Sequence, residues 1–298
     1  MEKILSINNL NKKYGKIHAV NNLSLDIFKG NIFGILGPNG SGKTTTLGII
    51  LSVINADSGK FSWFGESNSK YNRKRIGAIL EQPIFYPYLS AVKNLKIIAD
   101  IKEVDHSDIE RVLHTVDLYH RKDSKYRTFS YGMKQRLAIA AALLGKPEVL
   151  IFDEPTNGLD PKGIAEIREL IIAIAKEGIT IILASHLLDE VQKTCSHVAV
   201  LKDGSILFNG RVSDVLNIMD TIEVSSDDIP LLKMALNEST LVIEITADHE
   251  MLIVKLKEGI TIAELNHYLV SKGIVVTHLI RRKKTLEDQF LELLLDKK

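Results

Sequence analysis

The sequence predicts an α/β fold followed by a smaller α+β domain, and two observations carry this prediction. The apolar segment 32–36 leads into the glycine-rich segment 37–44 and then into a helical segment, which is the strand, loop and helix order of a phosphate-binding unit. Beyond residue 211, strand and helix patterns follow in the order β-α-β-β-α-β, which is typical of a ferredoxin-like sandwich. We therefore expect a first domain over 1–210 and a C-terminal accessory domain over 211–298.

Strand patterns recur through the first domain, and the expected strands are 4–10, 23–27, 32–36, 59–64, 76–80, 149–152 and 179–184. Their near-continuous apolar character indicates a mostly parallel sheet covered on both faces, with antiparallel strands at its edges. Between about 83 and 145 the apolar spacing becomes helical. The simplest interpretation is a helical subdomain inserted into the sheet.

Turn and cap signals place the later elements of the first domain. Asp160 is expected to cap a helix that has Pro161 at its first position and Gly178 just past its end. A short helix is expected over 187–194, and Asp203-Gly204 predicts a hairpin.

The second domain shows four strand patterns, two helical patterns and a further helix near its end. The expected strands are 222–224, 242–245, 252–256 and 274–276, and the expected helices are 231–236, 262–270 and 285–295. Thr261 and Glu264 form a capping box before the second of these helices.

Composition excludes several classes of protein. Lys and Arg total 38 against 37 Asp and Glu, so no overall positive field favours nucleic acid, and no nucleic-acid partner is expected. The single cysteine, Cys195, cannot form an internal disulfide, which favours a reducing compartment. No signal-peptide pattern and no apolar run of roughly 18 residues is found, so we expect no membrane span in this chain.

The glycine-rich segment matches the pattern G-x-x-x-x-G-K-[ST] in full, as Gly37-Pro-Asn-Gly-Ser-Gly-Lys-Thr44. Its glycines allow backbone N–H groups to converge on phosphate oxygens, and the following helix start adds a partial positive charge. Lys43 is placed to reach the β- and γ-phosphates, and the Thr44 hydroxyl to coordinate Mg²⁺. The alternative, a chance glycine-rich turn, is disfavoured by the strand before the segment and the helix after it.

Two adjacent carboxylates, Asp153 and Glu154, end the apolar strand expected at 149–152. Asp153 can turn toward a Mg²⁺ ion, while Glu154 can orient or deprotonate a water that attacks the γ-phosphate. An acidic pair can also mark a strand that simply enters a loop. The phosphate-binding loop upstream favours the catalytic interpretation.

The segment Phe129-Ser-Tyr-Gly-Met-Lys-Gln-Arg136 resembles the signature motif of ATP-binding cassette (ABC) ATPases. Ser130 and Gly132 match the serine and second glycine of that motif, whereas Tyr131 and Met133 stand where glycine and glutamine are usual. Ser130 is also placed to cap a helix, and a helix start with a serine hydroxyl can bind an anion. A plain helix cap is the structural alternative.

Further residues match elements of the same family in order. Tyr14 resembles the aromatic residue that stacks on adenine, Gln82 the glutamine that contacts Mg²⁺ and the attacking water, and His186 the histidine that contacts the γ-phosphate. Asp160 lies in a segment, Asn157-Gly-Leu-Asp160, that resembles the loop crossing to the partner subunit. Purely structural roles for Tyr14 and His186 are the alternatives.

The resemblance implies a P-loop NTPase of ABC type, with a mixed sheet core and a helical subdomain over about 83–145, that uses ATP and Mg²⁺. It implies nucleotide contacts by Tyr14, Gly37, Pro38, Asn39, Gly40, Ser41, Gly42, Lys43, Thr44, Thr45, Ser130, Gly132, Asp153 and Asp160. It implies metal contacts by Thr44, Gln82 and Asp153, and catalytic roles for Gln82, Glu154 and His186.

The same resemblance implies a head-to-tail dimer, a homodimer in the simplest case, with ATP between one subunit's phosphate loop and the other's signature motif. A separate transmembrane permease subunit would hold the chain at the cytoplasmic face of the cell membrane. Phe85, Tyr86 and Tyr88 are candidates for the surface that receives this permease, with core packing as the alternative.

Segment 285–291 resembles the closing segment of ATPase subunits in drug, bacteriocin and lantibiotic export or immunity systems. An exporter of drug, peptide or lipid-like cargo is therefore expected. A soluble, non-transport ABC ATPase is an alternative, although the chain has one cassette and no long heptad tract. A regulatory ATP-binding module is another, motivated by Tyr131 and Met133.

Overall fold

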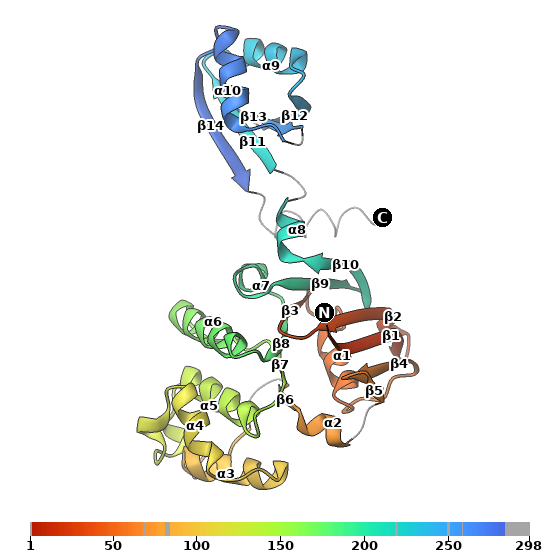
Figure 1. The fold of residues 1–298 in the computed structure, drawn as a ribbon, viewed down its shortest axis with the longest axis vertical. Coiled ribbons are helices and arrows are strands. Elements are labelled where there is room, and N and C mark those ends of the chain that lie inside the picture. Colours follow the sequence, from red (N-terminus) through yellow and green to blue (C-terminus); the bar gives the residue numbers. More distant parts are fainter. Residues whose placement is uncertain are drawn as a thin grey trace. The chain divides into compact units, whose positions relative to one another are not determined.

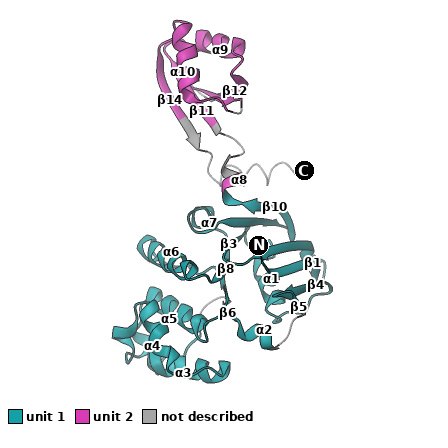
Figure 2. Cartoon of the chain, in the orientation of Figure 1, with its two compact units in different colours: residues 1–212 teal, residues 213–298 magenta. Residues whose placement is uncertain are grey.

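The computed structural model describes residues 2–67, 70–80, 84–217, 220–248, 251–257 and 259–283. The chain divides into two compact units, residues 1–212 and 213–298 (Figure 2). The sequence predicts this boundary at about residue 210. The helix expected over 285–295 lies outside the described residues.

A six-stranded sheet forms the centre of the first unit (Figure 1). Its strands run in the order β10 (Ser205–Arg211), β9 (His197–Lys202), β3 (Ile32–Leu36), β8 (Thr180–Ser185), β7 (Val149–Asp153) and β6 (Ile76–Ile79). All neighbours pair in parallel except β10, which pairs antiparallel with β9. Because β3, β7 and β8 are parallel neighbours, the loops after them leave from the same edge of the sheet.

The sequence predicts that the antiparallel strands lie at the edges of the parallel sheet, which is wrong for all of them except β10. The others form a second, four-stranded sheet. Its order is β2 (Ile17–Phe28), β1 (Lys3–Tyr14), β4 (Ser58–Trp63) and β5 (Glu66–Ser67). β1 and β2 are also longer than predicted, because asparagines that resemble turn formers lie inside the strands. Asn9 and Asn22 have φ of 51° and 48°, and Asn9 Nδ2 donates to Asn22 Oδ1 at 2.7 Å. Asparagine tolerates this left-handed conformation, so irregular positions are accommodated without ending the strands.

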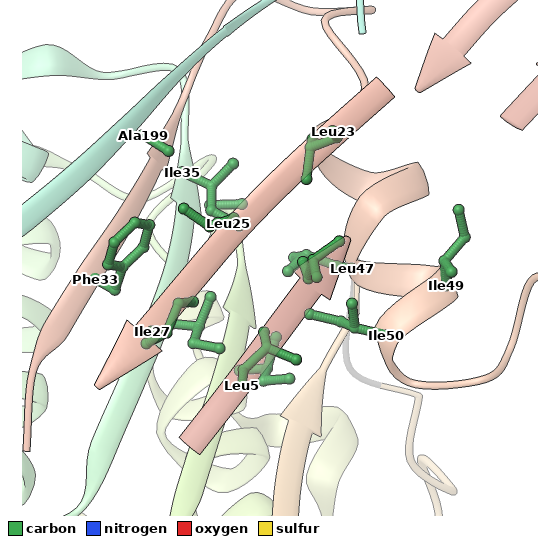
Figure 3. Close-up of a cluster of buried hydrophobic side chains, with 14 of the residues drawn as sticks. Leu5, Leu23, Leu25, Ile27, Phe33, Ile35, Leu47, Ile49, Ile50 and Ala199 are labelled. Carbon is green, nitrogen blue, oxygen red and sulfur yellow. The ribbon is translucent and has the colours of Figure 1, made fainter. Parts of the chain in front are cut away.

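The two sheets of the first unit share one apolar core around helix α1 (Lys43–Ile50). Figure 3 shows Leu25 and Ile27 of β2, Phe33 and Ile35 of β3, and Leu47 of α1 in this cluster. Leu47 is fully buried. The phosphate-binding loop that begins α1 is therefore anchored on one side by a rigid core.

Seven helices are described in the first unit besides two short 3₁₀ turns. After α1 come α2 (Lys70–Lys74), α3 (Ala91–Lys102), α4 (Asp108–Thr115), α5 (Tyr131–Leu143), α6 (Pro161–Lys176) and α7 (Leu188–Thr194), with 3₁₀ turns at Tyr119–Arg121 and Tyr126–Thr128. Helices α3, α4 and α5 pack on one another and form the expected helical subdomain (Figure 1). Helix α2 was not expected from the sequence.

The end of α5 joins the helical subdomain to the sheet. Lys102 Nζ donates to the carbonyl oxygens of Ala141, Ala142 and Leu144 at 2.9, 3.1 and 3.2 Å. Burial lowers the pKa of Lys102 to about 8, although the nearby Asp108 charge raises it. A Cβ at Gly77 of β6 would lie 2.2 Å from the Ala142 oxygen, so this close approach requires glycine.

The predicted cap of α6 and the predicted hairpin are confirmed. Asp160 accepts from the Gly163 N–H at 3.1 Å, and Pro161 is the first helical residue. Asp203 and Gly204 both have positive φ, 48° and 76°, as a type I′ turn between β9 and β10 requires.

The second unit contains the expected β-α-β-β-α-β order. After α8 (Val212–Asn217) its elements are β11 (Asp220–Ser226), α9 (Ile229–Glu238), β12 (Val242–Asp248), β13 (Met251–Leu256), α10 (Ile262–Ser271) and β14 (Val276–Lys283). The strands form an antiparallel sheet in the order β12-β13-β11-β14, with both helices against it around a separate apolar core. The capping box of Thr261 and Glu264 is confirmed.

One strand boundary in the second unit differs from the prediction. Ile274 is buried but precedes β14, and its N–H donates to Leu269 O at the end of α10. From the sequence alone, a buried apolar residue such as Ile274, just after a helix, cannot be distinguished from the first residue of a strand. Among the described residues of either unit, no helix is both long and apolar enough to cross a membrane.

Candidate functional site

The loop between β3 and α1 is closed by glycines packed against backbone. Gly42, the N-cap of α1, has a φ of 101°, and a Cβ there would lie 2.1 Å from the Ala19 oxygen. A Cβ at Gly37 would lie 2.5 Å from the Leu201 oxygen. No side chain caps α1, and the buried Ser41 hydroxyl has no hydrogen-bond partner among the described residues. A helix start without a capping side chain, beside a buried hydroxyl, suits a phosphate.

Lys43 is turned inward from the first position of α1. Its side chain is only 6% exposed, and Nζ donates to Gly37 O at 2.7 Å and to Pro38 O at 3.3 Å. Nζ also lies 3.4 Å from Glu154 Oε1. The ammonium group therefore joins the phosphate-binding loop to the carboxylate that follows β7.

Thr44 and Asp153 meet across the ends of α1 and β7. The Thr44 hydroxyl donates to Asp153 Oδ2 at 2.7 Å, and the Asp153 side chain is buried. A hydroxyl and a carboxylate are hard oxygen ligands of the kind that Mg²⁺ prefers. Among the described residues, no group of three or more His, Cys, Asp or Glu side chains could hold a metal ion alone. A hydroxyl with one carboxylate fits an ion that takes its other ligands from phosphates and water, as Mg²⁺ does.

Glu154 occupies an unusual backbone conformation and contacts His186. Its φ is 49°, and its N–H donates to Ala184 O at 2.9 Å. His186 Nδ1 lies 2.8 Å from Glu154 Oε2, and the His186 N–H donates to the same oxygen at 3.4 Å. Because a carboxylate only accepts hydrogen bonds, Nδ1 carries the proton in this pair. The left-handed turn places the Glu154 carboxylate between Lys43 and His186.

A second carboxylate, Glu190 of α7, lies buried behind this pair. Its Oε2 accepts hydrogen bonds from the hydroxyls of Thr156 at 2.6 Å and Ser185 at 3.3 Å. Burial raises the pKa of Glu190 above its ordinary value, and the nearby Glu154 charge raises it further. Glu190 thus contacts both of the loops that carry Glu154 and His186.

An open cavity of about 520 Å³ lies over these groups. Its lining includes Thr44, Ile84, Tyr131, Gln135, Asp153, Glu154 and Asn157. This volume falls within the range of about 300–1,000 Å³ that small-molecule sites occupy. The cavity therefore brings together the metal-binding candidates, the candidate base and the start of α5.

Tyr131, which departs from the usual signature motif, packs on the loop after β7. A Cβ at Gly158 would lie 3.4 Å from Tyr131 Cε1, so the ring lies directly over this glycine. Gly158 has a φ of 80°, which also favours glycine. The tyrosine therefore links the start of α5 to the segment that resembles the subunit-crossing loop.

Ser130 and Asp160 are helix caps within this chain. The Ser130 hydroxyl accepts from the Met133 N–H at 3.3 Å at the start of α5, and Asp160 caps α6. Neither lines the cavity that contains Thr44 and Asp153. A Cβ at Gly132 would lie 3.8 Å from the Leu159 side chain, which is ordinary contact. Both residues therefore act as helix caps within this chain. Their contact with the nucleotide of a partner subunit stays a prediction.

The remaining expected site residues lie away from the cavity or outside the described residues. Tyr14 is 48% exposed at the end of β1, with Lys12 Nζ 5.5 Å from its ring centroid. Gln82 lies outside the described residues. Phe85 packs on the Tyr126 ring at 5.1 Å between centroids, whereas Tyr86 and Tyr88 are exposed. The aromatic segment thus combines core packing with an exposed surface.

Sequence reasoning missed Glu190, Thr156, Ser185 and the buried Gln135. A signal existed for Glu190, because it immediately precedes Val191 on the buried face of a short helix, where an acid is costly unless paired. No local pattern identifies its partners, because Thr156 is 34 residues away in the sequence.

Comparison with known proteins agrees with the fold. The sequence model of the ABC transporter family matches residues 20–157. The chain is 45% identical over 212 residues to the bacitracin transport ATP-binding protein BcrA of Bacillus licheniformis, covering 70% of this chain and 69% of that protein. It is 34% identical over 302 residues to BcrA of Enterococcus faecalis, covering 99% and 97%. It is 40% identical to the lantibiotic transport ATP-binding protein SrtF of Streptococcus pyogenes, covering 68% and 89%.

Solved structures show the same fold over the first unit. The protein cbiO1 of Clostridium perfringens, part of an ABC transporter complex, matches with a TM-score of 0.65 and 31% identity, over 72% of this chain and 91% of that one. An ATP-binding cassette solved as a dimer with ADP and Pi after hydrolysis matches with a TM-score of 0.61 and 26% identity, over 70% and 99%.

The fold and the phosphate-binding loop define a nucleotide-binding ATPase. The chain belongs to the family of ABC transporter ATP-binding proteins. It is accordingly an ATP-binding and ATP-hydrolysing subunit of an ABC transport system.

Proposed function

We propose that this subunit hydrolyses Mg²⁺-ATP in the cavity over Thr44, Asp153 and Glu154, with Glu154 as the general base. One observation carries the proposal: Glu154 lies 3.4 Å from Lys43 and 2.8 Å from His186, at the edge of the sheet where β3, β7 and β8 end. A base, a cation and an orienting imidazole thus converge beside the phosphate-binding loop. These are the parts that attack on a γ-phosphate requires.

The roles follow from the contacts. Glu154 takes a proton from the attacking water, and the oxygen of that water bonds to the γ-phosphorus. The bond between the γ-phosphorus and the bridging oxygen breaks, which gives ADP and phosphate. A γ-phosphate that reaches Lys43 competes with Glu154 for the ammonium, which frees one carboxylate oxygen to accept the proton. The hydrogen bond from His186 holds the other oxygen in place.

Thr44 and Asp153 would hold Mg²⁺, with Gln82 as the further expected ligand. When bound, the ion would neutralise negative charge that develops on the phosphates during transfer. The Thr44 hydroxyl donates to Asp153 at 2.7 Å, so the two oxygens already lie close to each other. Lys43 would hold the β- and γ-phosphates, and Tyr14, exposed at the end of β1, would stack on the adenine.

We further propose that two copies close head to tail around ATP, with Ser130, Gly132 and Asp160 acting across the interface. The absence of Ser130 from the lining of this chain's own cavity supports a role at a partner's nucleotide. The dimeric form of a related cassette with ADP and Pi also supports this arrangement.

A transmembrane permease is the proposed second partner, and it would hold the subunit at the cytoplasmic face of the membrane. The exposed Tyr86 and Tyr88 beside the helical subdomain offer a surface for it. The names of the bacitracin and lantibiotic transport relatives favour a cargo of this peptide-like kind. We propose outward movement on the resemblance of segment 285–291 to export subunits. We also propose a ferredoxin-like class for the second unit, on its strand order β12-β13-β11-β14.

The test of the catalytic proposal is the Glu154→Gln variant. Its amide cannot accept the proton of water, so we expect kcat to fall by about 10²- to 10⁴-fold while ATP affinity stays within a few-fold of the original. Turnover and equilibrium titration with labelled nucleotide measure the two quantities. Glu169→Gln, an exposed change on α6, is the matched control and should leave both unchanged. Unchanged turnover in Glu154→Gln would remove Glu154 from the mechanism.

A further inference from the structure

A buried carboxylate that belongs to no phosphate or metal contact lies directly behind the catalytic pair. Glu190 is 4% exposed, on the inner face of α7. Burying a carboxylate is costly, and an apolar side chain would fill the same space without that cost. Its neighbour Val191 already provides apolar packing, since it contacts the β3 position of Gly34. Packing alone therefore does not explain an acid at this position.

The hydrogen bonds of Glu190 explain the acid. The hydroxyl of Thr156, two residues after Glu154, donates to its Oε2 at 2.6 Å. The hydroxyl of Ser185, the residue before His186, donates to the same oxygen at 3.3 Å. Ser185 Oγ in turn accepts from the Leu187 N–H at 3.0 Å, which fixes the chain on the other side of His186. One buried oxygen atom thus joins the loop of the base to the loop of the histidine.

We propose that Glu190 is a positioning residue that sets the distance between Glu154 and His186 by holding Thr156 and Ser185. The inference rests on the catalytic roles proposed above for Glu154 and His186. The loop after β7 already contains a left-handed residue, Glu154, with a φ of 49°, so its carboxylate depends on support from the surroundings. Small displacements of a catalytic group are costly, because an error of about 1 Å can lower a rate by about 10²-fold.

The proposal predicts a difference between two substitutions of the same residue. Glu190→Gln keeps an oxygen that accepts from both hydroxyls, so we expect kcat within about threefold of the original. Glu190→Leu keeps the volume and removes the acceptor, so we expect kcat to fall by about 10- to 100-fold. The KM for ATP should stay within about twofold in both, because the described hydrogen bonds of Glu190 go to Thr156 and Ser185, outside the phosphate-binding loop.

Two further variants test the two hydrogen bonds of Glu190 separately, and they do not depend on whether Glu190→Leu folds. Thr156→Val removes the hydroxyl of the Glu154 loop, and Ser185→Ala removes that of the His186 loop. Each should lower kcat without raising KM. Thr156→Val should have little additional effect in the Glu190→Leu background, because both changes remove the same hydrogen bond. Val191→Ala, a buried change on the same helix, is the control for lost packing and should leave kcat near the original at a temperature where it is folded.

Several outcomes would overturn the proposal. Original turnover in folded Glu190→Leu would do so, as would equal losses in Glu190→Gln and Glu190→Leu, since the acceptor would then not matter. Additive losses in the Glu190 and Thr156 double variant would also contradict it. Glu154→Gln separates this inference from the proposed function. If that variant keeps full turnover, the catalytic assignment fails, whereas a loss there with none in Glu190→Leu removes only the positioning role.

Discussion

The starts of α1 and α5 are both expected to meet phosphate, yet they are built in opposite ways. Helix α1 begins after Gly42, and no side chain occupies its first amides. Helix α5 begins after Ser130, whose hydroxyl accepts from the Met133 N–H at 3.3 Å. One start is open to an anion, and the other is satisfied within the chain but keeps its hydroxyl proton as a donor.

Backbone packing explains why α1 is not capped in the same way. Gly42 has a φ of 101°, and any Cβ would meet the Ala19 oxygen at 2.1 Å. Two pairs of polar groups also meet at the start of α1. Thr44 donates a hydrogen bond to Asp153, and Lys43 forms an ion pair with Glu154. The start of α5 has Tyr131 against Gly158 instead. The start of α1 therefore has the groups of a nearly complete phosphate site, whereas the start of α5 has only a capped helix and a hydroxyl donor, as the proposed role at a partner's nucleotide requires.

Of the changes at the two helix starts, the larger effect is expected from removing the cation at the α1 start. Lys43→Ala should weaken ATP binding by about 10- to 100-fold, because charged hydrogen bonds to phosphate are lost. Equilibrium titration with labelled ATP measures this change, and Lys60→Ala, an exposed change on β4, is the control. Wild-type affinity in Lys43→Ala would show that the α1 start is not the phosphate site.

A smaller effect, visible only between two chains, is expected at the α5 start. In a Glu154→Gln background, Ser130→Ala should weaken ATP-dependent dimerisation by about tenfold, as expected for one lost hydrogen bond to a charged group. ATP affinity of the monomer should stay unchanged. Sedimentation at increasing protein concentration measures the dimerisation constant.

Helix α3 supplies the matched control for Ser130. Ser90 caps α3 and accepts from the Lys93 N–H at 3.3 Å, the same geometry as the cap at Ser130. Ser90→Ala and Ser130→Ala should therefore lose similar stability, about 1 kcal/mol, whereas only Ser130→Ala should weaken the dimer. Equal dimerisation in the two variants would leave Ser130 as a plain helix cap.

The smallest effect concerns the other end of α5, where Lys102 is buried against three carbonyl groups. Burial lowers its pKa to about 8 from 10.5, so between these pH values the folded state binds fewer protons than the unfolded state. Stability contributed at this site should therefore rise with pH across that window, by an amount on the order of 1 kcal/mol.

The Lys102→Met variant isolates this contribution from the other groups that titrate at high pH. The free energy of unfolding of the original protein, minus that of the variant, should increase between pH 8 and about 10.5 in urea titrations. A difference that does not vary with pH would show that Lys102 titrates alike in both states. The end of α5 would then not be anchored by a buried amine.

Much of the fold could be predicted because its signals are local. The loop from Gly37 to Thr44, the cap at Asp160 and the turn at Asp203-Gly204 each lie within a few residues, and each is found as expected. The separate antiparallel sheet was not predicted, because strand patterns carry no information on which strand is the neighbour. The predicted start of β2 at residue 23 is wrong, because Asn22, a residue type common in turns, lies inside the strand Ile17–Phe28 with a φ of 48°.

The candidate site divides in the same way. Lys43, Thr44, Asp153, Glu154 and His186 could be named from motifs, because their chemistry requires those residue types at those places. Their contacts could not, since the Thr44 hydroxyl and its partner Asp153 are 109 residues apart. Glu190 was not found, because the sequence does not show that its carboxylate accepts hydrogen bonds from Ser185 and from Thr156, which is 34 residues away.

The sequence by itself therefore determined which groups are candidates to meet the nucleotide, since glycines, a lysine and adjacent carboxylates in that order have few other uses. Only the tertiary structure decided how these groups act on one another. Parallel pairing of β3, β7 and β8 brings the three loops to one edge, and the left-handed turn at Glu154 aims its carboxylate at Lys43 and His186. Pairing between strands that are distant in the sequence depends on how the whole core packs. No single segment of the sequence therefore carries the information that specifies this pairing.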